Sequence, residues 1–248
     1  MNEILLALNQ IMDRHIKFPG TQQERNSVKQ GFYEKYRFPG VIGCIDGTHI
    51  AIIKPKVHEE SYFNRKGFHS MNALMICDSN LKIIAICARY GGASHDAHVW
   101  QMMAIKPPLE EANNRETFWL LGDSAFPLRP YMMTPILNAV PGSPEENYTK
   151  MQCRVRNCIE RCFGILKSRW RCLLKHRVLH YTPAMAVRIS NACAVLHNMA
   201  IEAHMPEPDD LIIEDDFREV VNIADQAHDL QRGRLTQRQL VETLNQQM

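Results

Sequence analysis

The stretch VIGCIDGTHIAII, residues 41–53, is apolar and rich in β-branched side chains. It is too apolar for a strand with one face in water, so we interpret it as a buried central strand. Pro55 ends it. A carboxylate, Asp46, lies in its middle, and the rest of the chain is interpreted from this strand outward.

Two more apolar stretches follow, residues 67–78 and 81–90, on either side of the turn-forming cluster Asp78-Ser79-Asn80. This pattern predicts a β-hairpin. Gly91-Gly92 then breaks the chain, a helix is expected from about Ser94 to Met103, and residues 117–123 form a short apolar strand. A crossover helix between strands favours parallel pairing of 117–123 with 41–53, which predicts an α/β fold with a mixed sheet.

Helical patterns occupy both ends of the chain. We expect helices over 2–16, from Thr21 to Tyr36 behind a capping box, over 151–174, and from Thr182-Pro183 to Glu202. Three parts result: an N-terminal helical segment (1–38), interpreted as the remnant of a longer region, a catalytic domain (39–204), and an acidic, polar C-terminal tail (205–248). Within the tail, residues 235–247 are expected to form one helix.

Bulk properties exclude several classes of protein. The 248 residues are 45% hydrophobic and 23% charged, as in soluble globular proteins. No apolar run approaches the roughly 18 residues that cross a membrane. Eight cysteines occur without a Cys-x-x-Cys pair, so we expect free thiols. Cys158 and Cys162, four apart on a helix, are a weak candidate metal pair.

The charge is unevenly distributed. Residues 150–188 hold ten Lys and Arg but one acid, Glu160, whereas residues 207–219 hold seven acids and one Arg. The basic block indicates a polyanion-binding surface, and the acidic stretch a solvated or self-masking tail. An ordinary charged helix face explains either block equally well.

Two carboxylates end up on neighbouring strands in this arrangement. Asp46 lies inside one apolar strand, and Asp123 ends the next. A buried carboxylate must be hydrogen-bonded, paired with a cation, or bound to a metal. Two that converge repel each other unless a proton or a cation lies between them. Oxygen-only ligation favours Mg²⁺ or Mn²⁺ over Zn²⁺.

Glu160 is the third candidate acid. By itself it suggests an Arg156–Glu160 pair on a solvated helix face, but beside two unexplained carboxylates we interpret it as a ligand. Three carboxylates around two divalent cations can hydrolyse a phosphodiester without a covalent intermediate. The basic side chains of the same helix are then expected to bind nucleic acid: Arg154, Arg156, Arg161 and Lys167.

Five segments together resemble the Harbinger (PIF-type) transposase superfamily and its transposase-derived nuclease relatives: FPGVIGCIDGTHI (38–50), NRKGFHSMNALMICD (64–78), GGASHD (91–96), LLGDSAFPL (120–128) and RNCIERCFGILKSRW (156–170). The resemblance implies a ribonuclease-H-like fold with Asp46, Asp123 and Glu160 as metal-binding acids. It also implies a metal role for Asp96, for which a helix-terminal charge is an equal alternative.

The same resemblance implies partners. Relatives carry an N-terminal helical DNA-binding region that the short segment before Asp46 does not match. We therefore expect DNA as the substrate and a separate Myb-like DNA-binding protein as the targeting partner. The expected location is the nucleus, with the cytoplasm as a second compartment.

Two other classes of function stay open. A domesticated transposase can keep its fold and lose catalysis, which would leave a DNA- or protein-binding module. Gly122-Asp123-Ser124, with Asp225 and His228 downstream, has the residue types of a serine hydrolase. Asp225 and His228 lie in the polar tail, which disfavours the hydrolase.

Overall fold

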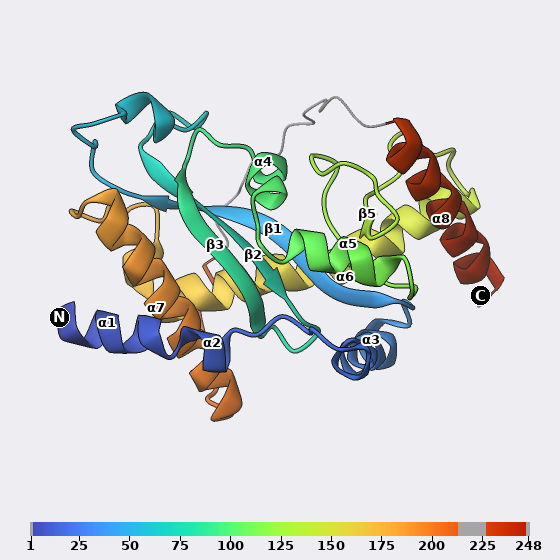
Figure 1. The fold of residues 1–248 in the computed structure, drawn as a ribbon, viewed down its shortest axis with the longest axis horizontal. Coiled ribbons are helices and arrows are strands. Elements are labelled where there is room, and N and C mark those ends of the chain that lie inside the picture. The colour runs from blue at the N-terminus through green and yellow to red at the C-terminus, as the bar shows by residue number, and fades with distance from the viewer. Residues whose placement is uncertain (1, 213–226, 247–248) are drawn as a thin grey trace.

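A mixed five-stranded sheet forms the centre of the protein in this computed structural model, which describes residues 2–212 and 227–246. The strands are β1 (Val41–Ala51), β2 (Ser70–Cys77), β3 (Ile83–Gly91), β4 (Trp119–Leu121) and β5 (Met132–Met133). Their order across the sheet is β3-β2-β1-β4-β5 (Figure 1). The predicted α/β, ribonuclease-H-like mixed sheet with flanking helices is confirmed.

The hairpin and the parallel crossover are both as predicted. β1 and β2 pair antiparallel, as do β2 and β3. β1 and β4 pair parallel, with Cys44 opposite Leu121. The turn at Asp78 is closed by its own side chain, because Oδ1 accepts the backbone N–H groups of Asn80 and Lys82. A buried strand with two paired edges explains why 41–53 is apolar along its whole length.

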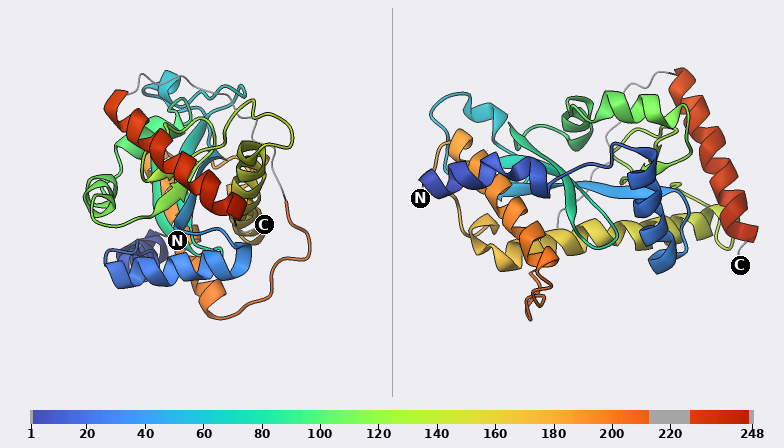
Figure 2. Two further views of the ribbon diagram at one scale, coloured as in Figure 1. Left: turned by 90° about the vertical axis from the view of Figure 1, so that its right-hand side faces the viewer. Right: turned by 60° about the horizontal axis from the view of Figure 1, so that its bottom comes forward.

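Helices cover both faces of the sheet (Figures 1 and 2). One core lies between the sheet and the long helices α6 (Pro144–Arg169) and α7 (Pro183–Glu202). The other lies beneath α4 (Asp96–Gln101) and α5 (Lys106–Asn113). Helices α1 (Asn2–Gln10), α2 (Met12–His15) and α3 (Gln22–Tyr36) complete the N-terminal part, and 3-10 turns occupy Glu59–Ser61 and Arg171–Leu173. No helix in the described ranges is long and apolar enough to cross a membrane.

Local capping signals account for the helix starts. Thr21 and Glu24 form the predicted capping box, and Thr182 caps α7 ahead of Pro183. α6 begins seven residues earlier than the expected 151, because Ser143 accepts the Glu146 N–H at 3.2 Å and Pro144 occupies the first turn. The sequence predicts the helix only from residue 151 because its apolar stripe becomes clear there.

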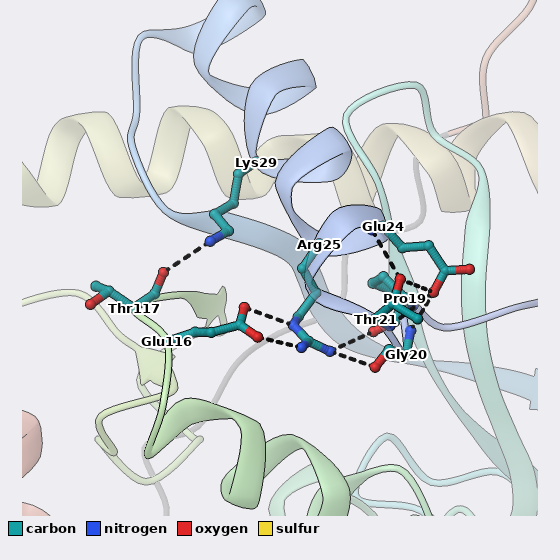
Figure 3. Close-up of polar contacts among 8 residues, drawn as sticks. All are labelled: Pro19, Gly20, Thr21, Glu24, Arg25, Lys29, Glu116 and Thr117. Carbon is teal, nitrogen blue, oxygen red and sulfur yellow. Dashed lines mark hydrogen bonds and ion pairs between the residues drawn. The ribbon is translucent and has the colours of Figure 1, made fainter.

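An ion pair joins α3 to the segment that enters β4 (Figure 3). The guanidinium of Arg25 binds both carboxylate oxygens of Glu116, at 2.6 and 3.2 Å, and donates to the carbonyl of Gly20 at 2.8 Å. Lys29 donates to the carbonyl of Thr117. These contacts hold the start of the strand whose far end leads to Asp123.

The C-terminal segment differs from the expected polar tail. Helix α8 (Ala227–Gln246) begins before the expected residue 235 and packs against α6 and β5. Leu240, Val241 and Leu244 are buried there, and Gln237 donates to the carbonyl of Thr134. An apolar stripe hidden in a polar composition is the reason for the difference. Residues 213–226 of the predicted tail lie outside the described residues.

Candidate active site

The register of two parallel strands brings Asp46 and Asp123 together. Cys44 pairs with Leu121; Asp46 lies two residues further along β1, and Asp123 two residues past Leu121, just after the end of β4. Both side chains face inward, since each residue is only 7% exposed. β4 ends at Leu121, so the edge of β1 beside Asp46 is not covered by that strand.

Burial makes both carboxylates hard to ionise. It raises the pKa of Asp46 well above its ordinary range, and the negative charge of Asp123 raises it further, whereas Arg156 opposes the shift. Burial likewise raises the pKa of Asp123, against the hydrogen bond that its carboxylate accepts from the Ala125 N–H. The two acids therefore form a site that favours a neighbouring cation.

The cation that the structure provides is Arg156 of α6. Its Nη1 donates to Asp46 Oδ2 at 3.0 Å, and its Nη2 donates to Glu160 Oε1 at 2.9 Å. Arg156 is 3% exposed, while the Glu160 side chain is 37% exposed. The Arg156–Glu160 pair is therefore present, but it reaches inward to Asp46 instead of lying on a solvated face. Glu160 and Asp46 share one guanidinium and thus the same side of the sheet.

Asp96 reaches β1 from α4, on the face of the sheet opposite to α6. It is the first residue of α4, and its Oδ1 accepts a hydrogen bond from Asn72 Nδ2 at 2.7 Å. Its carboxylate lies against the backbone of Gly47, where a Cβ would come 2.1 Å from Oδ1. The charge of Asp96 also raises the pKa of Asp46. Asp96 thus belongs to the same group of acids.

Gly47 and Asn72 are site residues that the sequence interpretation missed. A glycine inside a strand often marks a close approach of another group, so Gly47 beside Asp46 was a usable signal. Asn72 gave no comparable signal, because its neighbour Asp96 is distant along the chain. Only the pairing of β2 with β1, in which Asn72 faces His49, brings it to the site.

The donor chemistry of these side chains fits a hard divalent cation. The available atoms are carboxylate oxygens and the buried Asn72 Oδ1, which lacks a hydrogen-bond partner among the described residues. All-oxygen donors suit Mg²⁺ or Mn²⁺. Among residues 2–212 and 227–246, however, no group of three or more Asp, Glu, His or Cys side chains is already arranged to hold a metal ion. Arg156 serves as the counter-cation instead.

The four predicted nucleic-acid contacts lie in different environments. Arg154 is exposed, and Arg161 is exposed but binds Glu207 at 2.8 Å. Arg156 and Lys167 are buried, each 3% exposed, and Lys167 donates to the carbonyl of His49. The charges of these two side chains are directed to acceptors inside the protein. Contact with nucleic acid stays a prediction.

The alternative hydrolase site cannot be assembled from the described residues. Ser124 follows Asp123 directly and is partly buried. Asp225 and the side chain of His228 lie outside the described part of the chain.

Comparison with known proteins gives one consistent result. A family model described as a DDE superfamily endonuclease matches residues 45–198, a range that contains all four acids. "Putative nuclease HARBI1" of Bos taurus is 37% identical over 201 residues, and the Homo sapiens protein of the same name is 36% identical. Each alignment covers 80% of this chain and 57% of the relative. "Protein ALP1-like" of Arabidopsis thaliana is 24% identical over 79% of this chain and 51% of its own length. No solved structure matches the chain significantly.

Proposed function

Because the chain belongs to the DDE endonuclease superfamily, we propose that it is a transposase-derived nuclease that hydrolyses phosphodiester bonds of DNA. Asp46, Asp123 and Glu160 would be the catalytic acids, with Asp96 as a further ligand. A bound Mg²⁺ or Mn²⁺ would supply water activation and leaving-group stabilisation. The chain spans 57% of the length of the HARBI1 proteins, so activity, substrate and partner are all parts of this proposal.

The observation that carries the proposal is the convergence of acids at β1. Asp46 and Asp123 are both buried, and the charges of Asp123 and of a third acid, Asp96, raise the pKa of Asp46. Such an arrangement costs stability unless it serves a ligand, because apolar residues would pack there at no electrostatic cost. Buried acids whose pKa values are shifted in this way are typical of functional sites.

Arg156 has a positioning role in this proposal. Its guanidinium holds the Asp46 and Glu160 carboxylates through its two terminal nitrogens, Nη1 and Nη2. It thus orients Glu160 of its own helix and Asp46, which lies 110 residues before Arg156 in sequence. The same contact supports the second candidate, a catalytically silent binding module, because a permanent internal cation could stand in place of a metal.

DNA cleavage with matched variants separates these candidates. The wild type should nick plasmid DNA in Mn²⁺ or Mg²⁺. Asp123→Asn should lower the rate at least about a hundredfold, since even second-shell ligand partners are worth 10–100-fold. Ser124→Ala, one residue away, should keep most activity.

Two results would contradict the proposal. Loss of activity in Ser124→Ala but not in Asp123→Asn would replace it with the hydrolase mechanism. A wild type that neither cleaves DNA nor gains thermal stability with Mn²⁺ would leave the silent module.

We also propose the remaining parts of the biological context on the family resemblance. Sequence-specific targeting would come from a separate Myb-like DNA-binding protein. The protein would act mainly in the nucleus, where its DNA substrate is, and would also occur in the cytoplasm.

A further inference from the structure

The outer face of α6 is covered by a later part of the chain. Residues 206–212 run along it: Glu207 binds Arg161 at 2.8 Å, the carbonyl of Pro206 accepts from Arg169, and the Ile212 N–H donates to Ser168 Oγ. This covering segment is acidic, with Glu207, Asp209 and Asp210 in its sequence. A polyanion approaching this half of α6 would therefore meet negative charge.

A second group of cations lies beyond the end of β1. The 54–69 loop and residues 171–180 are far apart in sequence but lie side by side, since Ile52 bridges to Leu179 and Lys175 Nζ is 4.7 Å from the ring centroid of Phe68. Figure 1 shows both near the start of α7. Together they present six exposed cations, which we call the basic surface: Lys54, Lys56, Arg65, Arg171, Lys175 and Arg177.

The acids near the basic surface only partly offset it. Across residues 54–69 and 171–180 the sequence has two, Glu59 and Glu60. Glu59 binds Lys54 at 2.7 Å and His69 at 3.0 Å, and Glu60 lies 3.6 Å from His58. The 171–180 segment carries no acid at all. Its excess positive charge therefore faces solvent.

The basic surface is connected to the candidate active site in two ways. Arg65 Nη2 contacts His95 Nδ1 at 2.8 Å, and His95 immediately precedes Asp96. β1 itself runs from Asp46 toward Ile52, a separation of about 20 Å at roughly 3.3 Å per residue. That length corresponds to about six base pairs of duplex at 3.4 Å each. A duplex bound at the acids would thus reach this surface within one helical turn.

We propose that the basic surface binds the phosphate backbone of the duplex DNA whose scissile phosphate occupies the acid site. This inference rests on the proposed nuclease function and adds the path of the substrate. Three of the six cations are arginines, whose guanidinium groups match phosphate oxygens in a bidentate geometry. Contacts to phosphates position a duplex without specifying its sequence. The surface therefore holds DNA of any sequence, flanking the cut.

Salt-dependent binding tests this assignment. The probe is a fluorescent duplex of about 20 base pairs, titrated by anisotropy between about 50 and 200 mM salt in the absence of divalent metal. Arg171→Ala/Arg177→Ala removes two exposed cations of the basic surface. The matched control, Arg14→Ala/Arg115→Ala, removes two exposed cations, one from α2 and one that lies two residues after α5 and binds Glu111. All three proteins should have similar melting temperatures, because none of these arginines is buried.

The negative slope of log K against log salt should become smaller in magnitude by about two in the Arg171/Arg177 variant and stay unchanged in the control. Equal slopes in both variants would overturn the proposal that the duplex runs over the basic surface, and would leave the proposed nuclease activity unaffected. A wild type that does not bind the duplex at the lowest salt would overturn the proposed function as well. Tighter binding of A-form RNA duplex than of DNA would overturn the assignment to DNA.

Discussion

Replacing Gly47 by alanine should displace Asp96 without changing the fold. A Cβ at position 47 would lie 2.1 Å from Asp96 Oδ1 and 2.4 Å from its Cγ. Carbon–oxygen contacts are ordinarily about 3.3 Å or longer, so the carboxylate must retreat by about 1.2 Å. That retreat would weaken the 2.7 Å hydrogen bond from Asn72. A misplacement of about 1 Å in an active site can cost roughly a hundredfold in rate.

The assay is plasmid nicking in Mn²⁺, with the Mn²⁺-induced rise in Tm as an independent readout of metal binding. We expect Gly47→Ala to lose about two orders of magnitude in rate and most of the Mn²⁺-dependent stabilisation. Its Tm without metal should fall modestly, in line with the roughly 1–3 kcal/mol cost of overpacking.

Gly164→Ala is the matched control beside Glu160. A Cβ there would meet only the carbonyl oxygen of Ile212 at 3.8 Å, an ordinary contact. Because alanine is favoured over glycine inside a helix by roughly 0.5–1 kcal/mol, this variant should be slightly stabilised and fully active. The reasoning would be refuted by a folded Gly47→Ala protein that cleaves DNA and responds to Mn²⁺ as Gly164→Ala does.

Three further substitutions test the packing of α3 and of α8. Arg25→Met leaves the carboxylate of Glu116, whose side chain is 11% exposed, without its cation, and should lower the free energy of unfolding by about 2 kcal/mol at neutral pH. Arg25 holds the pKa of Glu116 below its ordinary value. The pair therefore stabilises the fold above about pH 4, and this contribution disappears as the pH falls through the lowered pKa. In urea unfolding, the difference in free energy of unfolding between wild type and variant should be smaller at pH 3 than at pH 7. Leu240→Ala, at a residue only 2% exposed, should cost at least about 2 kcal/mol. Leu235→Ala in the same helix, at a residue 54% exposed, should cost under about 0.5 kcal/mol, and equal small effects would mean that α8 does not pack as described.

Local patterns were enough to predict the framework of the fold. The apolar run 41–53, the turn at Asp78-Ser79-Asn80 and the Thr182-Pro183 start each depend on residues adjacent in sequence. Their elements are β1, the β2–β3 hairpin and α7. Parallel pairing of β1 with β4 followed from the crossover between them, so the proximity of Asp46 and Asp123 could be inferred too.

The environment of Arg156 could not be predicted in the same way. A charged residue on a helix is normally exposed, and the sequence gives no sign that Asp46, 110 residues earlier, offsets its desolvation. The burial of Lys167 has the same origin, because its acceptor is a backbone carbonyl on β1. β5 has only two residues, too few to show a period of two. Each failure concerns a contact between distant segments.

The guanidinium of Arg156 bears on how the protein can be handled. Proteins whose folding energy comes from a bound ion unfold when that ion is chelated. Here a side chain of the same chain, Arg156, already offsets part of the negative charge of Asp46 and Glu160. The polypeptide should therefore fold during synthesis without any ion, tolerate EDTA throughout purification, and accept Mg²⁺ or Mn²⁺ only when a reaction is started.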